Sequence, residues 1–249
     1  MKNKKSSLYY DYHWNDYQTL DIPGVKTANA DAFLNQISNN FSSNETVLDV
    51  GCGNGVHWNY LRNIKNYQVD YFGIDNSRSA IENLKALSKH ENDTFDIQDA
   101  CNIQYPDNFF DVVFAYGVLG YTRDPELAFN EMFRVCKKRG VIGVFSPDIQ
   151  GLSRFVLDSI RFMARLVGMH GKKFLADLVV PVFGFASSDT NISLKNANWH
   201  QVREVILTNI GPKTLEIIKH KTIIRWFKDL NIEVLYNNQK APTQIWGRK

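Results

Sequence analysis

The feature that most constrains the fold is an alternation of short β-branched runs with helix-like segments between residues 46 and 145. Each run has the length of one strand, and the intervening segments carry apolar residues at helical spacing. This rhythm is typical of βαβ units, in which successive strands lie parallel in one sheet and helices cover it. The runs expected to form strands are TVLDV, VDYFGID, TFDIQ, DVVFAYG and VIGVFS.

The clearest of the expected helices is the segment DPELAFNEMFRVCKK. Asp124 can cap its first turn, and Pro125 suits the first helical position. Lys137 to Arg139 would then meet the negative end of the helix, and Gly140 would end it.

The rhythm changes after Pro147, where residues 148–212 show no convincing parallel strand and are predicted to be a helical insertion. The chain then resumes with a helix, HKTIIRWFKDL, and two strands, IEVLY and TQIWGR, which would close the sheet with an antiparallel edge. The predicted parts are an N-terminal aromatic flap and helix (1–40), a ligand-binding core (41–147), the helical lid (148–212) and the C-terminal part of the core sheet (213–249).

The first helix of the insertion is both basic and apolar. Its arginines, Arg154, Arg161 and Arg165, are expected on a solvated face. A role at a membrane surface or toward an acidic substrate is the alternative. The expected apolar stripe beneath consists of Phe155, Val156, Ile160, Met163 and Val167.

Composition and charge limit the function. The 249 residues, 44% apolar, suffice for one large domain or one domain with a cap. The 29 basic and 26 acidic residues leave a net charge of +3, which is too balanced for a nucleic-acid footprint. Small or neutral partners are therefore favoured, and no nucleic-acid partner is expected.

The cysteines and the N-terminus favour a cytoplasmic location. Cys52, Cys101 and Cys136 are scattered without metal-type spacing, which suits three small buried side chains in a reducing compartment. The N-terminus lacks the apolar core of an export signal. The most apolar run, LADLVVPVFGFA, is too short to span a bilayer, although peripheral membrane contact stays open.

The segment DVGCGNG places a glycine loop directly after the first strand. Its glycines are Gly51, Gly53 and Gly55, whereas the dinucleotide fingerprint G-x-G-x-x-G needs its last glycine where this chain has Val56. Glycines after a buried strand let the main chain turn tightly and approach a ligand closely. The loop therefore predicts a ligand site of the Rossmann type, but the spacing argues against NAD.

Asp49 indicates which ligand this loop holds. A carboxylate in the crevice would repel a pyrophosphate but attract an ammonium or another cation. S-adenosylmethionine (SAM) carries an α-amino group and a sulfonium but no phosphate. Its carboxylate can use free N–H groups of the loop and of the following helix. The alternative is a purely structural role, in which Asp49 only anchors the loop by accepting hydrogen bonds from backbone N–H groups.

Two more acidic residues, Asp75 and Asp99, lie at or just after the ends of the next two expected strands. Asp75 follows Gly55 by twenty residues, about the separation at which such folds present an acid to the ribose hydroxyls. Asp99 could accept from the adenine amino group while the Ala100 N–H donates to a ring nitrogen. The alternatives are that Asp75 caps the helix expected over 77–88 and that Asp99 is a solvated turn residue.

The segments VLDVGCGNG, YFGIDNS, DIQDA and the stretch from FDVVFAYG to VFSPD resemble, in order and spacing, the motifs of class I SAM-dependent methyltransferases. Within this family, the segments resemble most the small-molecule subgroup that includes ubiquinone and menaquinone methyltransferases. The resemblance implies a Rossmann-like α/β fold with a seven-stranded, mostly parallel sheet, an antiparallel last strand and helices on both faces. The candidate cofactor site comprises Asp49, Gly51, Cys52, Gly53, Asn54, Asp75, Asn76, Asp99, Ala100, Ala115 and Tyr116.

The chain departs from this family pattern in two places. The turn before the fifth strand reads KKRGV instead of Lys-Pro-Gly-Gly, which lies away from the expected cofactor site. Tyr121 stands where relatives often carry a histidine, so a role of that histidine does not carry over.

Methyl transfer from a sulfonium mainly requires alignment of the reactants and exclusion of water. If the acceptor must lose a proton, the candidate bases are Tyr121, His200 and His57. No metal-ligand cluster is apparent in the sequence. The aromatic N-terminus, YYDYHWNDY, is expected either to pack on the sheet or to cover the sulfonium.

The sequence therefore predicts a cytoplasmic enzyme that methylates a small, hydrophobic or ring-bearing acceptor, with oxygen favoured as the methylated atom. One alternative is a SAM-binding or S-adenosylhomocysteine-binding regulatory module without turnover. Another is a methyltransferase for a protein or RNA partner. The acceptor and the oligomeric state are left open.

Overall fold

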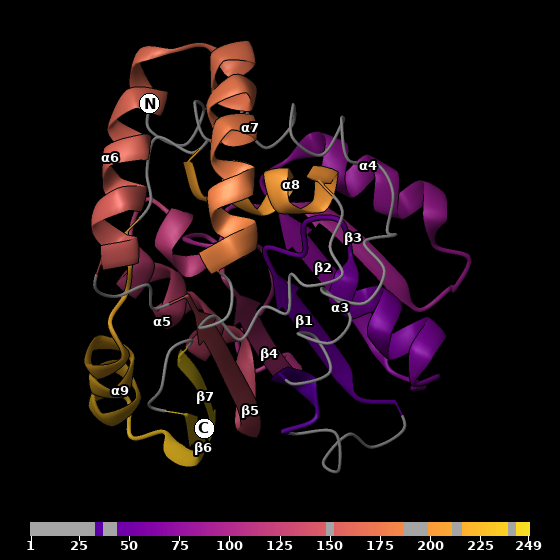
Figure 1. Ribbon diagram of the computed structural model, residues 1–249. Helices are drawn as coiled ribbons and strands as arrows, with labels where there is room; N and C mark the ends of the chain where they lie inside the picture. The colour runs from indigo at the N-terminus through magenta and orange to yellow at the C-terminus, as the bar shows by residue number, and fades with distance from the viewer. Residues whose placement is uncertain (1–32, 37–43, 148–151, 187–198, 211–215, 239–242) are drawn as a thin grey trace.

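The computed structural model describes residues 33–36, 44–147, 152–186, 199–210, 216–238 and 243–249. Seven strands form one sheet in the order β3-β2-β1-β4-β5-β7-β6 (Figure 1). Every run that the sequence marked as a strand lies in this sheet. The strands are β1 (Thr46–Val50), β2 (Asp70–Asp75), β3 (Asp93–Ile97), β4 (Phe110–Tyr116), β5 (Cys136–Ser146), β6 (Glu233–Asn238) and β7 (Thr243–Arg248).

The first five strands are parallel, and the sheet closes with an antiparallel strand. β1 pairs in parallel with β2 and β4, and β4 pairs in parallel with β5. β7 lies between β5 and β6 and runs antiparallel to both. The Rossmann-like α/β prediction is confirmed, and the carboxyl ends of β1, β2 and β4 meet at one edge, where such sheets bind ligands.

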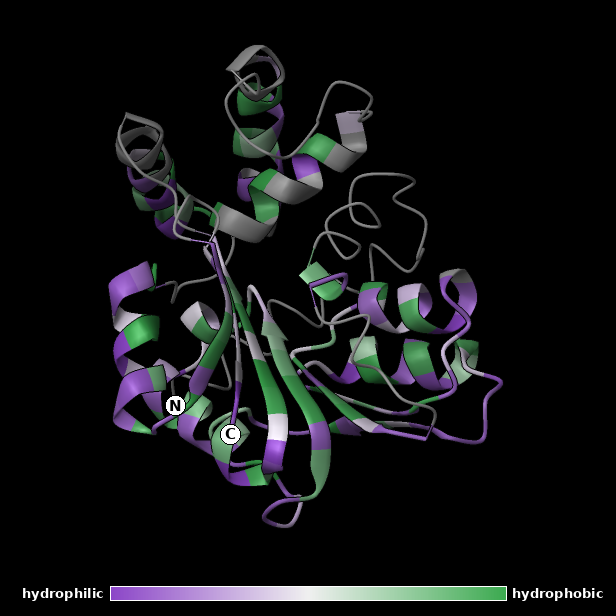
Figure 2. Ribbon diagram, turned by 90° about the horizontal axis from the view of Figure 1, so that it is seen from below, coloured by the Kyte–Doolittle hydropathy of each residue, from purple (hydrophilic) through white to green (hydrophobic). Residues whose placement is uncertain are grey.

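Helices cover both faces of the sheet (Figure 2). One face packs against α3 (Val56–Asn59), the π-helix Tyr60–Ile64 that continues it, and α4 (Arg78–Leu87). The other face packs against α5 (Pro125–Val135) and α9 (His220–Asp229). Each face has its own apolar core, because successive strand residues point to opposite sides of a sheet.

Strand β1 shows how this alternation places a charge inside the protein. Leu48 and Val50 belong to the core on the α5 side, whereas Val47 belongs to the core on the α3 side. Asp49 shares the face of Val47 and is fully buried. A buried carboxylate needs partners or a ligand, so this position marks a functional site.

The helix expected from Asp124 to Gly140 is shorter than predicted. Asp124 caps α5 as expected, because its side chain accepts a hydrogen bond from the Leu127 N–H. The helix ends at Val135, and β5 begins at Cys136. The prediction that Lys137 to Arg139 meet a helix end is therefore wrong, because strand pairing with β4 starts before the basic run.

A buried ion pair holds the helix that follows the glycine loop. The Asp93 carboxylate at the start of β3 lies 2.6 Å from the Arg62 guanidinium, and both side chains are almost completely buried. The same carboxylate accepts hydrogen bonds from the Trp58 indole and the Ser88 hydroxyl. The network ties α3 and its π-helical extension to β3, and so fixes the position of the residues just after the loop.

Replacing Asp93 by alanine is expected to lower the free energy of unfolding by about 3–5 kcal/mol, because it leaves the Arg62 charge buried without its partner. Urea denaturation measures this loss. The control is Asp70→Ala, since Asp70 contacts the exposed side chain of Asn92 and should change stability by roughly 0.5 kcal/mol. Equal effects of the two substitutions would show that the buried network adds nothing.

The insertion contains three helices, α6 (Leu152–Leu166), α7 (Met169–Ala186) and α8 (Trp199–Ile210). They stand beyond the end of the sheet at which β5 finishes (Figure 2). The single basic stretch of the sequence is divided near Gly168 into α6 and α7. None of the helices in the described ranges is long and apolar enough to cross a membrane.

The predicted faces of α6 are partly wrong. Ile160 is buried as expected, but Met163 and Val167 are exposed and Ala164 is buried instead. Arg161, expected in solvent, is buried and lies 3.3 Å from Asp158. The reason is that α8 packs against Ile160 and Ala164, and the sequence did not reveal this partner. The side chains of Arg154, Phe155 and Val156 are outside the described set.

The cysteine prediction is confirmed, since Cys52, Cys101 and Cys136 are buried and free. The aromatic N-terminal stretch lies outside the described residues, so its role stays a prediction. Phe33, which lies within the range 1–40 predicted as flap and helix, packs on the indole of Trp246 in β7 with ring centroids 4.6 Å apart.

Candidate functional site

The glycine loop turns sharply at the carboxyl end of β1. Gly51, Gly53 and Gly55 all have left-handed φ angles, of 77°, 51° and 77°. The Gly51 and Cys52 N–H groups both donate to the Ile74 carbonyl on β2, which holds the loop against the neighbouring strand. A β-carbon at Gly51 would lie 2.3 Å from a methyl of Val118, so this position accepts only glycine.

Asp75 ends β2 and faces the same loop. Its carboxylate accepts hydrogen bonds from the Gly53 N–H at 3.0 Å and the Ser77 N–H at 2.9 Å. Burial nevertheless raises the pKa of Asp75 to about 6, with these N–H groups acting in the opposite direction. The alternative that Asp75 caps α4 is wrong, because the Ser77 side chain caps it by accepting from the Ala80 N–H.

Asp49 is held by side chains. Its Oδ2 atom accepts a hydrogen bond from the Tyr71 hydroxyl at 2.6 Å and lies 3.3 Å from Nδ1 of His57. The Oδ1 atom is buried and has no hydrogen-bond partner among the described residues. The sequence did not predict Tyr71 as a partner of Asp49, because only the register between β1 and β2 brings the two side chains together.

Asn54, five residues further along the chain, also has a buried polar atom. Its amide nitrogen Nδ2 has no partner among the described residues. A buried donor and a buried acceptor without partners are costly, and such groups usually meet a ligand or water. SAM carries an α-ammonium that can donate to Asp49 and an α-carboxylate that can accept from Asn54. The residues present therefore fit this cofactor.

The third acidic residue, Asp99, contacts the segment that follows β4. Asp99 accepts from the Cys101 N–H at 2.9 Å and lies 3.4 Å from Nε of Arg123, which follows β4. About a third of the Asp99 side chain is exposed. Ala100 and Asn76, the neighbours of Asp99 and Asp75, are half-buried.

Ala115 and Tyr116 end β4, next to β1. Ala115 is fully buried in the core. The Tyr116 ring stacks on Phe145 with centroids 3.9 Å apart, and it lies 4.8 Å from the His57 ring. Burial raises the pKa of Tyr116, so its phenol stays protonated. The pair forms an apolar wall beside the histidine.

The three candidate bases have different surroundings. His57 lies in α3, is almost completely buried and faces the Asp49 carboxylate. Burial raises the pKa of Tyr121 to about 12, although the Arg161 guanidinium acts in the opposite direction. His200 lies in α8, but its side chain is outside the described set. The structure thus brings His57 together with a predicted cofactor residue, whereas for His200 it offers no test.

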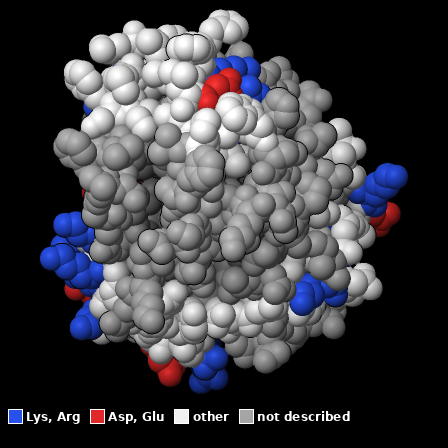
Figure 3. All heavy atoms as spheres, in the orientation of Figure 1, with Lys and Arg blue, Asp and Glu red and all other residues white. Residues whose placement is uncertain are grey.

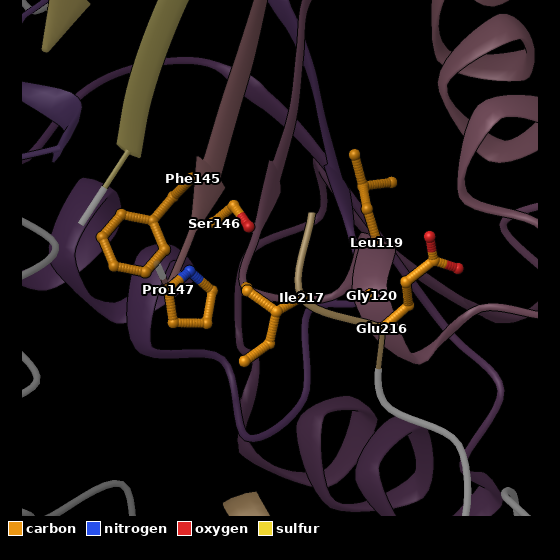
Figure 4. A pocket seen from close by; sticks show the side chains of 8 residues that line it. Leu119, Gly120, Phe145, Ser146, Pro147, Glu216 and Ile217 are labelled. Carbon is orange, nitrogen blue, oxygen red and sulfur yellow. The ribbon is translucent and has the colours of Figure 1, made fainter. Parts of the chain in front are cut away.

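A small hollow opens at the ends of β4 and β5 (Figure 4). The segment before α9 closes one side of it, where the Glu216 N–H donates to the Gly120 carbonyl. This segment could not be assigned to the site from the sequence, because only folding brings it to the sheet edge. The lining residues are Gly117, Leu119, Gly120, Phe145, Ser146, Pro147, Glu216 and Ile217.

A family model described as a methyltransferase domain matches residues 41–204, about two thirds of the chain. The chain belongs to this methyltransferase family. The class I SAM-dependent fold and the SAM cofactor predicted from the sequence are thereby confirmed. The match includes the glycine loop, the acids at the ends of β2 and β3, and most of the insertion.

Two similar curated proteins are methyltransferases that match this chain only in part. A sterol 24-C-methyltransferase of Aspergillus fumigatus is 32% identical over 40% of this chain and 27% of its own length. A 2-methyl-6-phytyl-1,4-hydroquinone methyltransferase of Synechocystis is 27% identical over 54% of this chain and 45% of its own. The chain thus matches less than half the length of these relatives.

Solved methyltransferases share the fold of this family member. The structure of a SAM-dependent methyltransferase from Aquifex aeolicus superposes with a TM-score of 0.53 and 14% identity, over 89% of this chain and 92% of that one. PKMT2 from Rickettsia typhi, in complex with AdoHcy, superposes with a TM-score of 0.52 and 15% identity, over 82% of this chain and 48% of that one.

Proposed function

We propose that this methyltransferase moves the methyl group of SAM onto a small, hydrophobic or ring-bearing acceptor. The observation that carries the cofactor assignment is the buried Oδ1 atom of Asp49, which has no partner among the described residues. It suits the α-ammonium of SAM, and the Nδ2 atom of Asn54 suits the α-carboxylate. Asp75 is assigned to the ribose hydroxyls, and Asp99 with the Ala100 N–H to the adenine.

When bound, SAM supplies an electrophilic methyl on a sulfonium and leaves as a neutral thioether. The protein therefore has to align the acceptor and exclude water. The stacked rings of Tyr116 and Phe145 form a dry wall beside the site. Asp49, fixed by Tyr71 and His57, orients the amino-acid end of the cofactor.

His57 is the base that we assign for an acceptor hydroxyl. The carboxylate of Asp49 next to Nδ1 favours a proton on that nitrogen, which leaves Nε2 as the proton acceptor. Tyr121 suits a different role, because a phenol with a pKa of about 12 keeps its proton at neutral pH. We assign it to hydrogen-bond donation toward the acceptor.

The acceptor class rests on the relatives. The hollow at the sheet edge is lined by both apolar and polar groups and is about the size of one water molecule, so it marks a place beside the site and does not define the acceptor (Figure 4). The named relatives act on a sterol and on a phytyl hydroquinone. The sterol relative is named for methylation of a carbon, so the choice of an oxygen as the methylated atom rests on the base assigned at His57.

The test is a search for turnover with purified protein, SAM and a fractionated metabolite extract. Accumulation of S-adenosylhomocysteine (SAH) above the background, together with a product 14 mass units heavier than its precursor, would support the proposal. SAM binding without any SAH would favour the regulatory module. Transfer to a protein or RNA fraction instead would favour the macromolecular alternative. The cytoplasmic location and the boundaries at residues 40, 147 and 212 stay predictions.

SAM affinity is expected to fall about tenfold between pH 8 and pH 5. Asp75 accepts from the ribose hydroxyls as a carboxylate, and its raised pKa of about 6 means that roughly nine tenths of the free protein is protonated at pH 5. Affinity should therefore rise with pH through 6 and then level off, as calorimetry at several pH values can measure. A flat profile between pH 5 and pH 8 would contradict the assignment of Asp75.

A further inference from the structure

The carboxylate of Asp99 is held at both of its oxygen atoms. Its Oδ1 atom accepts a hydrogen bond from the Cys101 N–H at 2.9 Å, and its Oδ2 atom lies 3.4 Å from Nε of Arg123. The backbone carbonyl of Asp99 also accepts from the Asn102 N–H at 2.8 Å, so the residue belongs to a closed turn after β3. A carboxylate with a partner at each oxygen does not rotate freely, so its remaining lone pairs keep a fixed direction.

The chain on either side of Arg123 is anchored as well. The Thr122 hydroxyl donates to the Leu119 carbonyl at 2.7 Å. Asp124 caps α5 through its side chain, and its carbonyl accepts from Sγ of Cys101 at 3.3 Å. The start of α5 is thereby tied to the turn after β3. Arg123 thus reaches the carboxylate from a backbone position that is fixed on both sides.

Arg123 and Asp99 form a local pair on a surface of mixed charge. Figure 3 shows basic and acidic side chains next to each other at several places on the visible part of the described surface. With 29 basic and 26 acidic residues in the chain, each exposed carboxylate is held mainly by its own neighbours. The Arg123 and Asp99 side chains are 46% and 33% exposed, so a ligand can reach the pair from solvent.

We propose that Arg123 makes the cofactor site selective for adenine by fixing the direction of the Asp99 carboxylate. The inference rests on the proposed function, in which Asp99 accepts a hydrogen bond from the adenine 6-amino group. Because a hydrogen bond weakens steeply when donor and acceptor are misaligned, the direction of the carboxylate decides how strong this bond is. Arg123 acts through Asp99 and is therefore a positioning residue.

A fixed carboxylate also discriminates against other purines. Hypoxanthine carries a carbonyl at position 6, and its oxygen would face the Asp99 carboxylate without a hydrogen between them. A purine without a substituent at position 6 would leave the ligand side of the carboxylate unpaired. Sites that are built to pair with a hydrogen-bonding group reject analogues that lack it. Arg123 should therefore affect the binding of adenine more than the binding of other purines.

The experiment compares SAH with an analogue in which unsubstituted purine replaces adenine, so that only the 6-amino group is missing. Arg123→Gln is expected to weaken SAH binding about fivefold, the upper range for a partly exposed ion pair, and to leave binding of the analogue nearly unchanged. Titration calorimetry at low salt measures both affinities. The matched control is Arg225→Gln, because Arg225 forms a similarly exposed pair with Glu126 outside the site. This control should bind both compounds as wild type does.

A double-mutant cycle shows whether Arg123 acts through Asp99. Asp99→Asn removes the charge with which Arg123 pairs, so adding Arg123→Gln should cause no further loss of SAH affinity. Unchanged SAH affinity in Arg123→Gln, or equal losses for SAH and the analogue, would overturn the proposal. Tighter SAH binding would also overturn it, because Arg123 would then compete with the adenine for Asp99. If wild-type protein does not bind SAH, the cofactor assignment itself fails, whereas an unaffected Arg123 variant beside a binding wild type leaves that assignment intact.

Discussion

Asp75→Ala is expected to weaken SAM binding by about two orders of magnitude. The carboxylate would accept charge-assisted hydrogen bonds from both ribose hydroxyls, each contributing roughly 1.5–3 kcal/mol. The substitution also removes the acceptor for the Gly53 N–H, which the wild-type carboxylate holds at 3.0 Å. Titration calorimetry with SAH at about pH 8 measures the loss.

Two controls separate contact with the ribose from support of the loop. Asp70→Ala, at the other end of β2, should bind SAH as wild type does. An SAH analogue without the ribose 2′-hydroxyl should bind wild-type protein more weakly and should discriminate less between wild type and Asp75→Ala. If the variant loses equal affinity for SAH and for this analogue, Asp75 supports only the loop. Unchanged SAH affinity would remove Asp75 from the site.

His57→Gln is expected to lower kcat by about 10² to 10⁴, the range typical of lost general-base catalysis. Glutamine keeps a hydrogen-bonding side chain at this position but cannot take up the acceptor proton. Asp49 keeps its hydrogen bond from Tyr71, so SAM affinity should change much less than kcat. SAH formation with the active extract fraction measures kcat, and calorimetry measures the affinity.

The split between rate and affinity distinguishes a base from a packing residue. Loss of a base lowers kcat and leaves SAM affinity nearly unchanged, whereas loss of packing around Asp49 lowers both. His90→Gln, at an exposed position outside the site, should leave both the rate and the affinity unchanged. A variant that loses rate and SAM affinity together would show that His57 only packs. Full activity of His57→Gln would mean that the acceptor needs no base.

Much of the fold could be predicted because it depends on local pattern. A run such as TVLDV can bury both faces only as a central strand, and alternation with helices requires parallel pairing. The end of α5 could not be predicted in this way, because pairing of Cys136 with Phe110 on β4 competes with helix continuation. The faces of α6 depended likewise on α8, a partner distant in the sequence.

The candidate site, like the fold, could be predicted only in part. The glycine loop and the acids at 49, 75 and 99 are local signals at strand ends, and the parallel sheet brings those ends to one edge. The contacts of each acid are not local. Tyr71 and His57 meet Asp49, and Arg123 meets Asp99, across strand register and loop packing.

The sequence by itself determined the sheet, the glycine loop and the class of cofactor, because backbone sterics, strand alternation and the charge next to the loop are properties of neighbouring residues. Only the tertiary structure decided that Asp49 is paired with His57 and that Asp99 is paired with Arg123. These outcomes depend on which distant segments fill the space around a side chain. The local sequence does not reveal these partners, because the residues that bury a side chain come together only when the protein folds.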